Sequence, residues 1–207
     1  MASTSRSLVP LAGVAFIVLG LLSFLVVGEP RTAGEPTGEI VEYYVENKNS
    51  IQAGAFLGVA ASLLLIFFGA HLREVLRAAA PDREMLSLVS FAGLVVVGLG
   101  FAIDITILFG LSEAAGDIDP VAVQALQALW DNVFVPQALG VLMFLWATGL
   151  AVVRTGVLPR WLGWVMIALG VIGLTPAASA APVGAAILVP ILSVMLSARA
   201  RSPVVTG

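Results

Sequence analysis

Cysteine is absent from the 207-residue sequence, and histidine and lysine occur once each, as His71 and Lys48. Without a thiol, the chain can form no disulfide, no thiolate metal site and no cysteine nucleophile. His71 has no second metal-ligand pattern near it, so neither a metal nor a haem is predicted. Lys48 lies in a polar segment, which excludes a retinal Schiff base inside a helix bundle. We therefore predict no cofactor and assign no catalytic residue.

Charge is also scarce, because Asp, Glu, Lys and Arg make up 11% of the residues while 59% are hydrophobic. Soluble domains carry about 25% charged residues. The deficit falls in long uncharged blocks, as expected for helices whose solvent is lipid. The sequence predicts an all-α fold, a single polytopic membrane domain with a six-transmembrane-helix bundle. The predicted spans are 8–28, 50–70, 86–111, 132–153, 161–176 and 182–198, with extracytoplasmic projections at 37–49 and 120–131.

The first and last apolar blocks each have a competing interpretation. A signal peptide would have an apolar core of about 7–15 residues followed by a small-x-small cleavage site. Residues 8–27 form a longer block that continues into Gly28-Glu29-Pro30, which favours an uncleaved span. The last block is interrupted at Thr175-Pro176 and Pro182. It forms either two short spans or a re-entrant hairpin, and both return the chain to the same side.

The basic residues are divided unequally by this topology. One side holds Arg6, Arg73, Arg77, Arg83, Arg154, Arg160, Arg199 and Arg201, and the other holds Arg31 and Lys48. Cytoplasmic loops of membrane proteins carry an excess of Lys and Arg. Both termini are therefore predicted to be cytoplasmic, in a multi-pass protein of the cell membrane.

A stripe of small and polar residues runs along the predicted third span. Ser90, Gly93, Val97, Gly100 and Asp104 follow a three-four spacing, which places them on one face of a helix. Small residues let membrane helices approach closely, and an acid in a span almost always faces the bundle interior. This helix is therefore predicted to be central. Gly54 and Gly58 form a similar packing pattern in the second span.

A long helical pattern follows the third span. It runs from Pro120 to Arg154, about 52 Å at roughly 1.5 Å per residue, whereas a hydrocarbon core is about 30 Å thick. Its first dozen residues should project from the membrane, with Gln124, Gln127 and Asp131 on one face. Pro136 is expected to kink the helix where it enters lipid.

The polar residues that need an explanation converge on the extracytoplasmic half of the bundle. The candidate ligand- or proton-binding residues are Asp104, Asp131, Asn132, Gln137, Tyr43 and Tyr44. No basic residue is available at the depth of Asp104, so its carboxyl is expected to be neutral, hydrated, or hydrogen-bonded to Asn132, Gln137 or a tyrosine. One interpretation is an outward-open polar pocket between spans two, three and four. The other is that these groups are interhelical hydrogen bonds worth about 0.6–2 kcal/mol each.

The remaining polar and aromatic features have simpler explanations. Trp130, Trp146, Trp161 and Trp164 are the set that an interfacial aromatic belt predicts. The short patch at Arg73, Arg77 and Arg83 is expected to meet anionic membrane lipid. Nucleic-acid binding is not supported, because acidic residues are mixed into this patch. No phosphate-binding loop or hydrolase motif is present.

Three short motifs resemble a group of uncharacterised six-span bacterial proteins, common in actinobacteria and classed as a domain of unknown function. The motifs are Glu42-Tyr43-Tyr44 with Asn49-Ser50, Leu72-Arg73 with Leu76-Arg77, and Leu158-Pro159-Arg160-Trp161-Leu162-Gly163-Trp164. The resemblance implies a bacterial inner-membrane protein with six helices. It implies no activity.

Two functions from different classes fit these features. The first is binding or carrying a small molecule or a proton, with Asp104 as the titrating group. The second is an accessory or scaffold subunit that holds a membrane-protein partner, with Asp104 as structural glue. A membrane enzyme would require a second acid or a base beside Asp104, so an enzymatic activity is not assigned.

Overall fold

The computed structural model describes residues 11–81 and 84–201 and is helical throughout, with no strand in these ranges. The helices are α1 (Ala12–Val27), α2 (Thr37–Glu46), α3 (Lys48–Ala79), α4 (Glu84–Ala114), α5 (Pro120–Trp130), α6 (Val135–Thr155), α7 (Arg160–Ile172) and α8 (Ala180–Arg201). The predicted all-α class is confirmed. Arg6, Arg83 and the first residues of the predicted first span, which are 8–10, lie outside the described residues.

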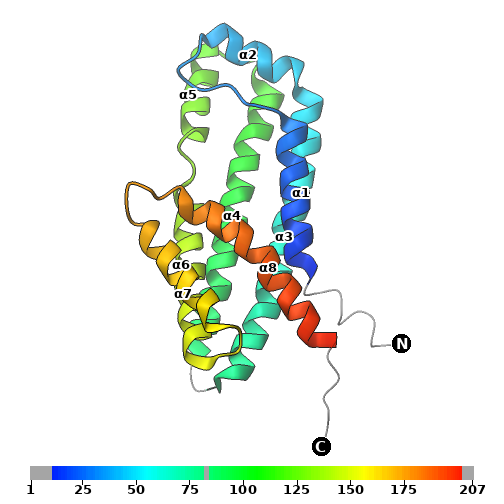
Figure 1. Ribbon diagram of the computed structural model, residues 1–207. Coiled ribbons are helices and arrows are strands. Elements are labelled where there is room, and N and C mark those ends of the chain that lie inside the picture. Colours follow the sequence, from blue (N-terminus) through cyan, green and yellow to red (C-terminus); the bar gives the residue numbers. More distant parts are fainter. Residues whose placement is uncertain (1–10, 82–83, 202–207) are drawn as a thin grey trace, which may run out of the picture.

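Six helices of the described residues, α1, α3, α4, α6, α7 and α8, form the bundle (Figure 1). α1 packs on α3, α3 on α4, α4 on α6 and α6 on α7, so these helices form a connected row. α8 crosses obliquely and packs against both α1 and α6. The main core lies between these helices and contains Phe68, Leu72, Phe144, Leu145 and Leu192, which are 0–1% exposed. α8 therefore links the two edges of the row.

The central crossing, between α4 and α6, is made by glycines. A Cβ atom on Gly93 would lie 2.6 Å from the backbone nitrogen of Phe144 and 2.7 Å from the carbonyl oxygen of Gly140. Nearby, the hydroxyls of Ser90 and Thr148 are 2.7 Å apart and both side chains are fully buried. The two backbones can approach this closely only because neither glycine has a side chain.

A helical cap, formed by α2 and α5, covers one end of the bundle (Figure 1). α5 begins at Pro120, and the Asp119 carboxylate accepts a 2.8 Å hydrogen bond from the Val121 amide, as the sequence pattern predicts. A second small core with Ile40, Tyr44 and Val123, all 0% exposed, joins the cap to α3 and α4. The cap is thus a packed part of the fold.

The predicted continuous helix from 120 to 154 is interrupted. α5 ends at Trp130 and α6 begins at Val135, with a turn at 131–134 between them. Pro136 has no amide to donate and disfavours helical geometry in the residue before it, so the expected kink becomes a break. The Asn132 side chain donates to the Ala128 carbonyl at 2.8 Å and satisfies one of the freed acceptors.

Four segments are long and apolar enough to cross a membrane. They are Lys48–Ala79, Glu84–Ala114, Pro120–Thr155 and Ala180–Arg199, while α1 and α7 are shorter apolar helices in the described residues. These helices fit an integral membrane protein. The turn between α7 and α8, at 173–179, lies part of the way along the bundle and does not reach the cap (Figure 1).

Candidate functional site

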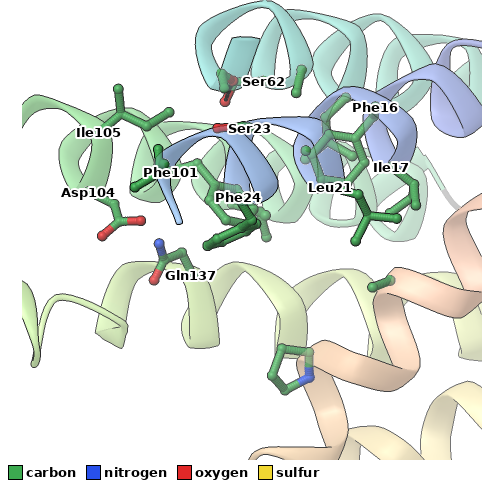
Figure 2. Close-up of a pocket in the computed structure, with 18 of the residues that line it drawn as sticks. Phe16, Ile17, Leu21, Ser23, Phe24, Ser62, Phe101, Asp104, Ile105 and Gln137 are labelled. Carbon is green, nitrogen blue, oxygen red and sulfur yellow. Dashed lines mark hydrogen bonds between the residues drawn. The ribbon is translucent and has the colours of Figure 1, made fainter. Parts of the chain in front are cut away.

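A cleft of about 240 Å³ lies between α1, α3, α4, α6 and α8, below the cap. Figure 2 shows Asp104 of α4 and Gln137 of α6 at one end of this cleft and Phe16, Ile17 and Leu21 of α1 toward the other. The wall between these ends is apolar. The Phe16 and Phe101 rings pack there with their centroids 6.2 Å apart. The cleft therefore has a polar end and an apolar end.

The cleft opens at the side of the bundle. Leu21 and Phe24, which line it from α1, are 60% and 59% exposed. Pro182 and Ala186 of α8 line it as well and are also exposed. Apolar side chains therefore surround the opening.

Asp104 is the only ionisable side chain among the described residues that line the cleft. The ion pairs of the described chain use Glu35, Glu113 and Glu84 as their acids, so Asp104 takes no part in them. The Trp130 indole lies beside the Asp104 carboxyl. The buried indole N–H is not aligned for a hydrogen bond to any described acceptor.

Gln137 faces the same end of the cleft from the first turn of α6. Its side chain makes no hydrogen bond within the described residues, so its amide is free to bind a ligand. Gln137 is held close to α4 by Gly100, because a Cβ atom on Gly100 would lie 2.7 Å from Cγ of Gln137. The glycine thus brings the amide and the Asp104 carboxyl to facing walls.

The two serine hydroxyls that line the cleft already donate hydrogen bonds to backbone carbonyls. Ser23 donates to the Gly54 carbonyl at 2.8 Å, and Ser62 donates to the Gly58 carbonyl at 3.0 Å. These bonds leave little capacity for a ligand away from the Asp104 end. Free polar groups are therefore concentrated at Asp104, Gln137 and Trp130.

The other predicted binding residues belong to the cap, and none of them lines the cleft. Asn132 bonds the Ala128 carbonyl, and the Tyr43 hydroxyl donates to the Val27 carbonyl at 3.0 Å. Tyr44 bonds Gln127 instead of Asp104. The expected hydrogen bonds from Asn132, Gln137 or a tyrosine to Asp104 are thus absent among the described contacts.

Gln127 is the centre of a buried polar network in the cap. Its amide oxygen accepts from the Tyr44 hydroxyl at 2.5 Å, and its amide nitrogen donates to the Arg31 carbonyl at 2.6 Å and to Asp131 at 2.8 Å. Both Gln127 and Tyr44 are 0% exposed. Burial raises the pKa of the Tyr44 hydroxyl above its ordinary value of 10.0, and Tyr43, Asp131 and Asp104 add to this rise.

The same face of α5 fastens the 31–37 loop. Asp131 accepts from the Ala33 amide at 2.9 Å, and Gln124 donates to the Ala33 carbonyl at 2.9 Å. Thr37 donates to the Gln124 amide oxygen at 3.1 Å. Asp131 is therefore a cap residue, and no hydrogen bond joins it to Asp104. Because Trp130 follows on α5, this fastening also fixes the indole at the polar end of the cleft.

The predicted packing residues lie at helix crossings. Gly93 and Ser90 face α6, and Gly100 faces Gln137, as described above. A Cβ atom on Gly54 would lie 3.0 Å from the Ser23 carbonyl, so Gly54 admits α1 against α3 and makes α1 a wall of the cleft. A Cβ atom on Gly58 would lie closest to the Ile105 side chain of α4 and 3.3 Å from the Ser23 hydroxyl, so Gly58 makes room for both α4 and α1.

Sequence reasoning missed two components of this site. Trp130 was interpreted as part of an interfacial belt, and α1 was not assigned to the pocket. The signal for Trp130 was its position three residues after Gln127 on the same α5 face. The contribution of α1 depends on its packing against helices that are distant in the sequence, and no local sequence pattern indicates this packing.

The chemistry available at the cleft is that of binding. No second acid or base among the described lining residues accompanies Asp104. Within the described part of the chain, no group of three His, Asp or Glu side chains is placed to hold a metal ion. An apolar chamber with a carboxyl, an amide and an indole N–H at one end is suited to an amphipathic molecule.

Comparison with known proteins identifies a family. The family model described as "Domain of unknown function (DUF4386)" matches residues 11–204. The chain therefore belongs to this family, which confirms the resemblance seen in the sequence. No curated protein and no solved structure matches the chain.

Proposed function

We propose that this DUF4386 protein is a multi-pass protein of the cell membrane that binds a small amphipathic molecule in its lateral cleft. The apolar part of the ligand lies along Phe16, Leu21 and Phe101, and its polar group contacts Asp104 and Gln137. The observation that carries the proposal is the concentration of free polar groups at one end of an otherwise apolar, laterally open chamber.

The contacts of Asp104 and Gln137 favour binding over interhelical glue. Polar residues that serve as glue hydrogen-bond across a helix interface. Gln137 makes no such bond in the described structure, and Asp104 has only the poorly aligned Trp130 indole beside it, whereas the Ser90 and Thr148 hydroxyls bond each other across α4 and α6. A polar group without a protein partner at membrane depth is costly, so a ligand or water must complete its interactions.

For the topology, we propose that both termini are cytoplasmic and that the cap is extracytoplasmic. The arginine distribution supports this orientation.

α7 has 13 residues, about 20 Å at roughly 1.5 Å per residue, which is shorter than a hydrocarbon core of about 30 Å. We therefore favour a re-entrant α7–α8 hairpin over the two full spans of the six-span prediction. The cleft then opens into the outer half of the bilayer.

The test is native mass spectrometry of the protein after gentle solubilisation, with the cleft open or blocked. Gly20 lines the cleft, and a Cβ atom there would meet nothing within 4 Å, so Gly20→Trp is chosen to bring a bulky ring to the chamber from a position whose Cβ has room. Gly110 is equally open but lies outside the cleft, so Gly110→Trp is the matched control.

The proposal expects a discrete small-molecule or lipid adduct on the wild type and on Gly110→Trp, and its loss in Gly20→Trp. An adduct that survives equally in both variants would place the molecule elsewhere on the protein. Co-purification of a stoichiometric second protein with an empty cleft would instead favour the scaffold function.

A further inference from the structure

The charge balance of the cleft distinguishes between ligand head groups. Among the described lining residues, Asp104 carries the one ionisable group and no arginine or lysine is present. The neighbouring polar groups, Gln137 and the Trp130 indole, are neutral. An anionic head group would lie beside a carboxylate with no cation to balance either charge.

A cationic head group would supply what the protein lacks at this position. The arginines and Lys48 that pair with acids in the described chain do so at Glu35, Glu84 and Glu113, away from the cleft. An ammonium group is a donor of three hydrogen bonds. It can donate to the Asp104 carboxylate, and also to the Gln137 amide oxygen once the amide, whose nitrogen lies toward Asp104 in Figure 2, turns over.

The aromatic lining is also compatible with a cation. Phe24 and Phe101 lie next to the Asp104 end of the cleft (Figure 2). Aromatic faces attract ammonium groups, most strongly where water is excluded. The electron-rich rings and the carboxylate thus favour the same sign of charge.

The rest of the cleft accepts only an apolar chain. The Ser23 and Ser62 hydroxyls are bonded to backbone carbonyls, and the remaining wall beyond Phe101 is aliphatic and aromatic. The lateral opening beside Leu21 lets a chain continue into the bilayer. A ligand with a single long alkyl chain therefore matches this part of the site.

We propose that the ligand is a long-chain amine, whose protonated amino group binds Asp104 and Gln137. This inference rests on the proposed function, and it adds the chemical class of the ligand. A simple alkylamine is protonated at pH 7, because its amine resembles that of lysine, with a pKa of about 10.4.

The test compares three ligands with the same chain and different head groups. Dodecylamine, dodecanol and dodecanoate are titrated against the protein in nanodiscs of neutral lipid, and the bound fraction is measured by native mass spectrometry. The variants are Asp104→Asn, Asp104→Glu and Gly20→Trp. Asp117→Asn, which removes an exposed acid of the α4–α5 turn, controls for general attraction of amines to the acidic outer surface.

We expect the wild type and Asp117→Asn to bind the amine at least about tenfold more tightly than the alcohol, because a hydrogen bond to a charged group is stronger than one between neutral groups. Both proteins should also bind the alcohol more tightly than the carboxylate. Asp104→Asn abolishes the preference for the amine, and Asp104→Glu retains part of it.

Equal binding of amine and alcohol by the wild type would overturn the inference and leave the proposed function intact, provided that Gly20→Trp blocks both. The wild-type comparison decides this even if Asp104→Asn fails to fold. Binding of all three ligands that is unaffected by Gly20→Trp would overturn the inference and the proposed function together.

Discussion

At the scale of single residues, the described structure separates polar groups that are satisfied from those that are not. Gln127 is fully buried and has a partner for its amide oxygen and two for its amide nitrogen. Gln137, by contrast, has no hydrogen bond in the described structure, and Asp104 has only the poorly aligned Trp130 indole as a neighbouring donor. Because buried polar groups are normally paired, the first pattern is that of a structural network and the second that of a binding site.

The Tyr44 hydroxyl makes stability depend on pH above neutrality. Its pKa is raised in the folded protein by burial, so above about pH 10 the unfolded chain releases a proton that the folded protein retains. The stability contributed by Tyr44 is therefore complete below pH 10 and falls as the pH rises further.

Tyr44→Phe should lower the apparent Tm at pH 8, because it leaves the buried oxygen of Gln127 without a donor, which costs about 1–3 kcal/mol.

This variant should also flatten the alkaline fall in Tm between pH 9 and 11. Tyr43→Phe is the control, since Tyr43 is only partly buried and its raised pKa has the same cause; it should have the smaller effect on both quantities. The two variants and the wild type are compared by thermal unfolding in detergent. Parallel curves for Tyr44→Phe and the wild type would show that Tyr44 does not titrate with unfolding.

At the scale of elements, the close approach of α4 and α6 determines the shape of the cleft. Gly93→Ala places a methyl group against the backbone of α6 and should destabilise the protein by about 1–3 kcal/mol, as overpacking does. Gly110→Ala is on the same helix in open space, and should not lower stability because alanine favours a helix over glycine. Thermal unfolding of both variants checks the difference. Equal Tm values would mean that the crossing tolerates wider spacing.

The sequence predicted where the helices begin and which residues share a helix face better than it predicted what each face contacts. The three-four stripe identified the faces of α4 that meet α6, and the Asp119-Pro120 pair located the start of α5. The grouping of Gln124, Gln127 and Asp131 on one face was also visible. What this face contacts was not, because its partners at Arg31 and Ala33 are backbone groups about a hundred residues away in the chain. Every residue has a backbone carbonyl, so the residue types in the sequence do not show which carbonyl will accept such a hydrogen bond.

At the scale of the whole molecule, α8 decides where the cleft opens. It crosses from α6 to α1 (Figure 1) and lines the cleft with Pro182 and Ala186, while the exposed Leu21 and Phe24 line the cleft from α1. The prolines at 176 and 182 indicated an interruption in the last block. They did not indicate that α8 would lie obliquely, since this depends on its packing against helices distant in the sequence.

The absence of cysteine allows the topology to be measured directly. Single cysteines at Gly116 in the α4–α5 turn, Ala78 near the end of α3 and Ser179 in the α7–α8 turn are labelled in whole cells with a membrane-impermeant maleimide. Gly116→Cys should react from outside, and Ala78→Cys only after permeabilisation. Ser179→Cys should resist labelling from outside, because a re-entrant turn does not reach the outer surface. Labelling of Ser179→Cys as readily as Gly116→Cys would support six full spans, and labelling of Ala78→Cys from outside would reverse the proposed orientation.

The most direct measurement of the central claim is photocrosslinking with a dodecylamine that carries a diazirine at the end of its chain. After irradiation in nanodiscs, the labelled residues are identified by peptide mapping. With its head at Asp104, the ligand should place the diazirine near Phe16 and Ile17, and this labelling should disappear in Gly20→Trp but persist in Gly110→Trp. Labelling spread over lipid-facing side chains such as Phe56 and Phe67, which are 70% and 62% exposed, and unchanged in Gly20→Trp, would contradict a ligand-binding cleft.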